Sequence, residues 1–326
     1  HSGGDSFQSY PRPASIKQGL QMLVYAIRRL VLIVPLLVAV ATITFFLMHT
    51  VQGGPFDQDR PISDATRANL NARYGLDEPL PVQYVTYLVN LTKLDLGISF
   101  SNDRPVRDVI GERFGISMQL GLSAFAMALI LGLALGVVSS VYQDGALDYV
   151  SVFFATIGAA LPSFILAPII VIVFAVEFGW FDVLGWELFN YKKMVLPTIA
   201  LGTLPTAYVA RITRASMLDV LRQDYIRTAR SKGVSEFLVV INHALKNAMI
   251  PVLTILGPIL AGLITGSFIV ERAFSIHGVG FTFVTSVLIR DYGVIMGITL
   301  FYATIIALMN LCVDLLYGVV DPRIRY

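Results

Sequence analysis

The side chains that could carry chemistry lie outside the long apolar stretches of this sequence. The internal histidines fall between those stretches and the nearest acidic residues stand at their ends: His49, His243, His277, Glu177, Glu271 and Asp314. A carrier coupled to protons or ions normally keeps ionisable side chains at mid-membrane depth. An intramembrane protease needs a mid-span Ser/His pair, an Asp pair or zinc ligands such as H-E-x-x-H, and the sequence has none of these. We therefore expect no covalent catalysis in this chain.

The sequence also lacks the usual residues for binding a nucleotide or a metal. No stretch reads GxxxxGK[ST], so the chain cannot hydrolyse ATP through that phosphate-binding loop. Its single cysteine, Cys312, excludes an internal disulfide and a cysteine-based metal site, and its apolar surroundings favour a small buried hydrophobe. We expect no metal or cofactor in this chain. If the protein pumps, its energy comes from another polypeptide.

The segment from Asp224 to Pro251, DYIRTARSKGVSEFLVVINHALKNAMIP, is called the elbow below. It is too polar to insert into a membrane, yet apolar residues recur in it at helical spacing: Ile226, Ala229, Phe237, Val240, Ile241, Ala244 and Leu245. Gly233 stands where a helix C-cap needs a left-handed residue, and Ser235 can cap a following helix. The pattern predicts two short helices joined at a glycine.

Two functions suit such an elbow. A compact helical knob could sit in a groove of a partner protein, with its basic residues setting the register. Alternatively, an amphipathic hairpin could rest on anionic lipid, which the same basic residues would favour. The residues alone do not separate these two interpretations.

The elements that must position the elbow are membrane-spanning helices. Of the 326 residues, 56% are apolar and 14% are charged, and the mean hydropathy is +0.71. A soluble domain has about a quarter charged residues, and a helix needs ~20 mostly apolar residues to cross a bilayer. Six windows qualify, which predicts an all-α integral membrane protein: Leu30–Met48, Ile116–Tyr142, Tyr149–Val176, Met194–Ala210, Asn247–Val270 and Tyr292–Val313.

Basic residues around these windows predict the orientation. The densest juxtamembrane run is Arg211, Arg214, Arg222, Arg227, Arg230 and Lys232, and Arg28 and Arg29 precede the first window. The positive-inside rule makes both regions, and with six spans both termini, cytoplasmic. The first window is too long for a signal peptide, so we expect a retained anchor. We expect a flexible extension at 1–21, a membrane domain at 22–326, a structured extracytoplasmic loop at 51–113 and a cytoplasmic loop at 211–250.

Small residues and prolines indicate how the spans pack. Residues at every fourth position of the second and fifth windows form strips where another backbone can approach: Ala124, Ala128, Gly132, Gly136, Ser140, Gly257, Ala261 and Thr265. Prolines should kink the third and fifth windows: Pro162, Pro168, Pro251 and Pro258. In the 51–113 loop we expect helices near 64–75 and 82–89, and a third after Pro105. Neither the strips nor the prolines indicate a function by themselves.

The elbow resembles a loop of known transporters. RTARSKG followed by HALKNAMIP is similar to the EAA loop of ABC importer permeases, in the variant of the peptide and nickel transporter family. Arg227, Thr228 and Ala229 take the Glu-Ala-Ala positions, Gly233 takes the glycine position and Pro251 closes the motif. The first two positions depart from the general pattern, as is typical of this variant. The resemblance implies that an ATPase subunit contacts a coupling helix: Arg227, Thr228, Ala229, Arg230, Lys232 and Gly233.

Further matches extend the resemblance over nearly the whole chain from Met22. YGLDEPLPVQY and LDLGIS in the 51–113 loop match, as do RDY and the terminal DPRIRY. Ile269–Gly280 resembles E-x-x-F-x-x-P-G-x-G, with His277 where proline is usual. GGPF and LITGSFIVE are most similar to the B subunit of oligopeptide permeases.

This resemblance implies a type I ABC importer fold in a bacterial cytoplasmic (inner) membrane. It also implies partners: a second homologous permease, two cytoplasmic ATPase subunits that bind ATP and Mg, and an extracytoplasmic substrate-binding protein facing 51–113. The mixed charge of that loop suits a protein contact and not a nucleic acid. The implied mechanism is alternating access with oligopeptides as cargo. Dipeptides, nickel chelates or oligosaccharides, a secondary carrier and a membrane anchor stay as alternatives, and the substrate-binding residues are unknown.

Overall fold

The structure is a computed structural model that describes residues 16–50 and 64–320. These residues form helices without any strand, apart from one isolated β-bridge between Ile98 and Pro105. The elements are α1 (Ile16–Thr50), α2 (Asp64–Tyr74), α3 (Leu80–Thr92), α4 (Val106–Val141), α5 (Ala146–Ala160), α6 (Ser163–Ile170), η1 (Val171–Glu177), α7 (Tyr191–Leu221), α8 (Asp224–Ser231), α9 (Glu236–Leu238), η2 (Val239–Leu245), α10 (Lys246–Ile264), α11 (Phe268–Ala273), α12 (Val279–Leu288) and α13 (Tyr292–Val320). The expected all-α fold is confirmed.

Six crossings of a membrane are possible within the described residues. Five helical stretches are long and apolar enough: Leu23–Thr50, Val106–Val141, Tyr191–Leu221, Glu236–Ala273 and Tyr292–Leu315. A sixth crossing exists if the bent pair Ala146–Ala160 and Ser163–Glu177 counts as one span. The six predicted windows therefore correspond to these five stretches and the bent pair.

The third predicted span is not one kinked helix. Its halves meet at an angle of 107°. Leu161, at the break, has an extended backbone with φ −91° and ψ 109°, and Pro162 is the N-cap of α6. A residue before proline is pushed out of the helical region, and proline has no N–H with which to continue the ladder. Pro168 lies inside α6, so only the first of these two prolines coincides with the sharp bend.

The fifth span also differs from its predicted window. The helix begins at Glu236 and continues through η2 into α10, which keeps both of its prolines, Pro251 and Pro258, inside. It breaks after Ile264, where Gly266 has φ +93°. Glu271, which we expected at a span end, is fully buried in α11. A carboxyl group that is buried away from water requires hydrogen-bond donors around it.

The predicted strip of small residues on the second span lies against α7. Ala124 and Ala128 are fully buried. A Cβ added at Gly132 would come 2.7 Å from the Val209 Cβ, and one at Gly136 would come 2.7 Å from the Ala210 carbonyl oxygen. The two helices therefore approach more closely than side chains at these glycines would allow. The prediction of close helix packing at this strip is confirmed.

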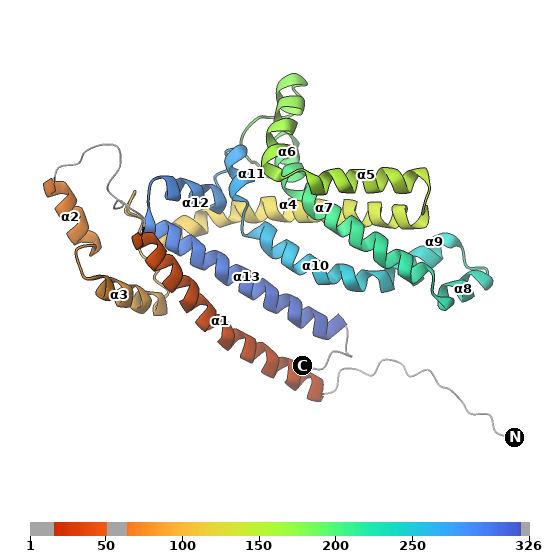
Figure 1. Ribbon diagram of the computed structural model, residues 1–326, viewed down its shortest axis with the longest axis horizontal. Coiled ribbons are helices and arrows are strands. Elements are labelled where there is room, and N and C mark those ends of the chain that lie inside the picture. The colour runs from red at the N-terminus through yellow and green to blue at the C-terminus, as the bar shows by residue number, and fades with distance from the viewer. Residues whose placement is uncertain (1–15, 51–63, 321–326) are drawn as a thin grey trace.

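The two ends of the bundle differ (Figure 1). α8 and α9 lie at one end, near the α4–α5 turn, whereas α2, α3 and α12 lie toward the other end. The Arg29 guanidinium lies 3.3 Å from the Asp314 carboxylate, which joins α1 to α13. The helix expected after Pro105 is the first part of α4 and not a separate element. The elbow and the cap formed by α2 and α3 thus face opposite ends of the molecule.

The cap confirms two of the helices expected in the 51–113 loop, as α2 and α3. The Thr42 and Tyr84 hydroxyls are hydrogen bonded at 2.7 Å and join α3 to α1. A cavity of about 230 Å³ lies between the cap, α1 and α13, where Phe45, Tyr87 and Tyr292 are among the lining residues. Burial raises the pKa of the Tyr87 phenol to about 12. The cap is packed onto the membrane helices and is not a loose linker.

Candidate functional site

The first arm of the elbow is α8, an amphipathic helix of eight residues. Asp224 places a carboxylate in its first turn, where the helix dipole stabilises a negative charge. Ile226 and Ala229, three positions apart, are buried, and the other residues of α8 are exposed. α8 is therefore attached to the bundle along one edge and presents its remaining surface outward.

One apolar cluster anchors this edge. It combines residues of α7, α8, η2 and α10: Met217, Ile226, Ala229, Val239, Val240, Ala244 and Ala248. Val137 and Val141, at the end of α4, pack against the same cluster. Residues of α4, α7, η2 and α10 thus share this one cluster with α8, so a displacement of α8 cannot leave them all unaffected.

The predicted glycine turn is present at Gly233. Its N–H donates to the Arg230 carbonyl at 3.0 Å, and the Val234 N–H donates to the Ala229 carbonyl at 3.3 Å. This pair of bonds is a Schellman motif, which needs a left-handed residue, and Gly233 has φ +76°. A Cβ at Gly233 would meet no atom within 4 Å. Glycine is needed there for its backbone conformation and not for space.

An ion pair bridges the turn. The Arg230 Nε lies 3.0 Å from one carboxylate oxygen of Glu236, and a terminal guanidinium nitrogen lies 2.6 Å from the other. The hydrogen bond with Glu236 raises the pKa of the Arg230 guanidinium. Both side chains are about half exposed, so the pair adds little stability, although its two bonds join the two arms across the turn. Sequence reasoning missed Glu236, although opposite charges six residues apart across a predicted turn are a usable signal.

The second arm is not the separate short helix that we expected. It starts at Glu236 and runs without interruption into the fifth span, because helical spacing continues from there into α10. Ser235 is its N-cap, as predicted, but its side chain makes no capping hydrogen bond. Phe237 is 74% exposed and Ile241 is 39% exposed, so these two apolar residues do not join the anchoring cluster.

The six residues predicted to contact an ATPase lie together on α8 and its C-terminal turn: Arg227, Thr228, Ala229, Arg230, Lys232 and Gly233. Ala229 is buried in the anchoring cluster, and the other five residues are exposed. The Thr228 hydroxyl donates to the Asp224 carbonyl at 3.0 Å. Ala229 therefore anchors the elbow, while the exposed residues supply its outer surface. Their contact with an ATPase stays a prediction.

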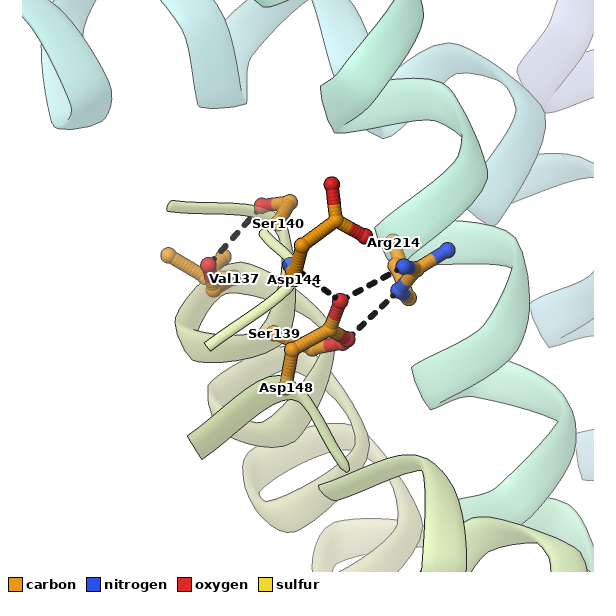
Figure 2. A network of polar contacts seen from close by, with 6 residues as sticks. All are labelled: Val137, Ser139, Ser140, Asp144, Asp148 and Arg214. Atoms are coloured by element: carbon orange, nitrogen blue, oxygen red, sulfur yellow. Dashed lines mark hydrogen bonds and ion pairs between the residues drawn. The ribbon is translucent and has the colours of Figure 1, made fainter. Parts of the chain in front are cut away.

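One member of the predicted basic run has a different place. Arg214, on α7, points toward Asp148 at the start of α5 (Figure 2) and forms two hydrogen bonds with its carboxylate. Asp148 is nearly fully buried. Arg214 is thus part of an internal network and not of an outer basic surface. The sequence gives no sign of this pairing beyond an acidic residue at the start of an apolar window, because the partners are 66 positions apart.

The long apolar helices and the exposed elbow define a class: a multi-pass membrane protein that presents an exposed helical element at one end. Residues 128–326 match the family described as binding-protein-dependent transport system inner membrane component. Residues 22–121 match the N-terminal segment described for such membrane components. The chain belongs to this family of inner-membrane transport subunits.

Individual relatives agree with the resemblance seen in the sequence. The chain is 43% identical over 302 residues to the dipeptide transport system permease protein DppB of Bacillus subtilis, covering 92% of this chain and 97% of that protein. It is 40% identical over 306 residues to the oligopeptide transport system permease protein OppB of Salmonella typhimurium, covering 94% and 100%. A structure of the MetNI methionine ABC transporter matches 65% of this chain and 96% of its own with a TM-score of 0.53 and 14% identity. That likeness supports the expected type I importer fold.

Proposed function

We propose that this chain is a permease subunit of an ABC-type importer that moves oligopeptides across the cytoplasmic membrane. The observation that carries the proposal is the first arm of the elbow, α8, which shares an apolar cluster with α4, α7, η2 and α10 on its inner edge and is exposed on its outer surface. A docking element needs both properties, because force applied to the surface must pass into the bundle. The outer surface then contacts an ATPase through Arg227, Thr228, Arg230, Lys232 and Gly233.

The importer contains further subunits. We assign it a second homologous permease, two cytoplasmic ATPase subunits and an extracytoplasmic substrate-binding protein. ATP and Mg bind to the ATPase subunits, and this chain contributes no catalytic group or cofactor. The basic residues of the elbow support a cytoplasmic position for it and for both termini. The cap is then extracytoplasmic, where the binding protein delivers cargo.

Coupling follows from the anchoring cluster. When ATP closes the ATPase pair, α8 is displaced. Ile226 and Ala229 transfer that displacement to Met217 of α7 and to the second arm, because close-packed side chains transmit strain. α7 and α10 then rearrange and the path between the permease subunits opens outward. No mid-membrane proton carrier is needed in this mechanism.

The cargo is assigned by similarity. The relatives are named for dipeptide and for oligopeptide transport at nearly equal identity. The segments GGPF and LITGSFIVE favour the oligopeptide branch. The dipeptide and oligopeptide assignments are separated by an uptake assay with the purified binding protein. The assay compares labelled dipeptides with labelled peptides of four to six residues. Uptake of dipeptides alone would replace the oligopeptide assignment with the dipeptide one.

The docking assignment predicts an effect of charge at the elbow. Arg227→Glu combined with Lys232→Glu reverses two exposed charges without touching the anchoring cluster. We expect the variant to insert normally but to bind the ATPase subunits at least tenfold more weakly, measured by association with the purified permease in lipid nanodiscs. Arg107 is an exposed residue at the start of α4, at the end of the molecule opposite the elbow. The control variant Arg107→Glu should therefore bind the ATPase subunits normally.

Three results would decide against this assignment. Normal ATPase binding by the elbow variant would contradict docking there. An equal loss of ATPase binding in the Arg107→Glu control would indicate a general effect of charge. If the elbow variant lost binding to anionic vesicles but kept ATPase binding, the result would instead support an amphipathic hairpin that rests on anionic lipid.

A further inference from the structure

A buried ion pair ties the α4–α5 turn to α7 (Figure 2). The Arg214 Nε donates to the Asp148 Oδ1 at 2.8 Å, and an Arg214 terminal nitrogen donates to Oδ2 at 2.7 Å. The Ser139 hydroxyl donates to Oδ1, and the Asp144 N–H donates to Oδ2 at 3.0 Å. The Asp148 side chain is 4% exposed and that of Arg214 is 30% exposed. Four donor bonds from α4, the turn and α7 therefore meet at one carboxylate.

This pair is not required to hold the helices together. α5 already packs on α7 through a cluster of small residues, Ala155, Ala207 and Ala210, and Gly158 lies against Thr203. A buried ion pair is weak evidence for stability, because desolvation offsets its attraction. Apolar contacts are non-directional, whereas a bidentate guanidinium–carboxylate pair fixes one geometry. What the pair adds is a fixed position of the turn relative to α7.

The pair also lies next to the elbow's anchor. Met217, three residues after Arg214, is fully buried in the cluster that contains Ile226. Val141, three residues before Asp144, packs against the same cluster. Both chain segments joined by the ion pair are thus in contact with the base of the elbow. α7 itself continues into α8 after only Arg222 and Gln223.

We propose that Asp148 and Arg214 are positioning residues that make the α4–α5 turn follow α7 when the elbow is displaced. This inference rests on the proposed coupling function of the elbow. Without the pair, the start of α5 is held to α7 only by non-directional contacts between small residues. With it, the displacement reaches the start of α5, the first half of the bent span. Ser139 and the Asp144 N–H hold the carboxylate in the orientation that the guanidinium needs.

Spin-label distances test the inference in the assembled importer with its partner subunits in nanodiscs. The single native cysteine, Cys312 on α13, is exposed and is not the buried hydrophobe that its apolar surroundings predicted, so it provides the reference label. Ser235→Cys reports on the elbow and Gln143→Cys on the α4–α5 turn, and both positions are exposed. In the otherwise unchanged chain we expect both distances to Cys312 to shift when ATP and vanadate are added. In Asp148→Asn we expect the 235–312 shift to persist and the 143–312 shift to disappear.

The two claims fail in different ways. No 235–312 shift in the unchanged chain would overturn the proposed coupling function itself. A normal 235–312 shift together with a full 143–312 shift in Asp148→Asn would overturn only the positioning role. If Asp148→Asn assembles poorly, Arg214→Lys keeps the charge but loses the fork, and the same loss of the 143–312 shift is expected. A full shift in that variant would equally overturn the role.

A transport readout separates positioning from simple stabilisation. We expect Asp148→Asn, and the double variant Asp148→Asn/Arg214→Gln, to move at least fivefold fewer peptides per ATP hydrolysed, with ATPase subunits still bound. The double variant removes both charges, so it excludes an unpaired arginine as the cause. Glu187→Gln, which breaks an exposed pair with Lys193, is the matched control and should stay within twofold of the unchanged chain. An unchanged ratio in the double variant would contradict the inference.

Discussion

At the scale of single residues, the burial of Glu271 could not be predicted from the sequence. Its carboxyl group accepts from the Ser117 hydroxyl at 2.7 Å and from the Phe281 N–H at 2.9 Å. It thereby ties α11 to α4 and to the start of α12. Ser117 lies 154 positions away, and a backbone donor has no sequence signature. Two nearby glycines leave space for the Glu271 carboxyl group. A Cβ added at Gly278 would come 2.5 Å from the Glu271 Oε2, and one added at Gly280 would come 3.1 Å from the same oxygen.

These donors predict the cost of removing the carboxyl group. Glu271→Ala leaves the Ser117 hydroxyl and the Phe281 N–H without this acceptor, and each unsatisfied buried donor costs about 1–3 kcal/mol. We expect a clear fall in the free energy of unfolding, measured by denaturant titration in detergent. Glu271→Gln keeps one acceptor oxygen and should lose less. Glu177→Ala, at an exposed position, should stay within about 0.5 kcal/mol. Equal losses in the Ala and Gln variants would show that the hydrogen bonds are not the cause.

At the scale of elements, local signals were predictable and long-range ones were not. Gly233 could be placed because a left-handed C-cap depends on a few neighbouring residues. The strip from Ala124 to Ser140 could be read from its spacing, but the sequence does not say that α7 is the helix that lies against it. The second arm of the elbow was misjudged, because periodicity alone does not show where a surface helix ends and a span begins.

Two glycines of α4 allow a matched test of its packing. A Cβ at Gly136 would come 2.5 Å from the Thr213 Cβ and 2.7 Å from a backbone carbonyl, whereas one at Gly115 meets nothing within 4 Å. Gly136→Ala should destabilise the chain by about 1–3 kcal/mol through overpacking. Gly115→Ala should be neutral or stabilise by up to about 1 kcal/mol, since alanine is the better helix former. Unfolding in detergent measures both, and destabilisation by Gly115→Ala would contradict the packing described for α4.

At the scale of the molecule, composition and window length predicted the helical membrane fold and the number of apolar segments. They could not predict the bend at Leu161, because Pro162 and Pro168 look alike in sequence and only the first coincides with a turn of the chain. The elbow could be assigned to a family through RTARSKG. Helical spacing placed Ala229 among its apolar residues, and the structure shows that Ala229 is buried in the anchor while the other five predicted contact residues are exposed. The Asp148–Arg214 ion pair could not be predicted from the sequence because its partners are 66 positions apart. The same holds for the hydrogen bond between Ser117 and Glu271, which are 154 positions apart.

The bent pair decides how many times the chain crosses the membrane, and cysteine labelling tests it. In a Cys312→Ser background, Gln143→Cys and Lys192→Cys flank the pair at exposed positions. If α5 and α6–η1 form one crossing, a membrane-impermeant maleimide labels Lys192→Cys in intact spheroplasts and Gln143→Cys only in inverted vesicles. Labelling of both from the same side would make the pair re-entrant. Five crossings would then put the ends of the chain on opposite sides, against the cytoplasmic position proposed for both termini.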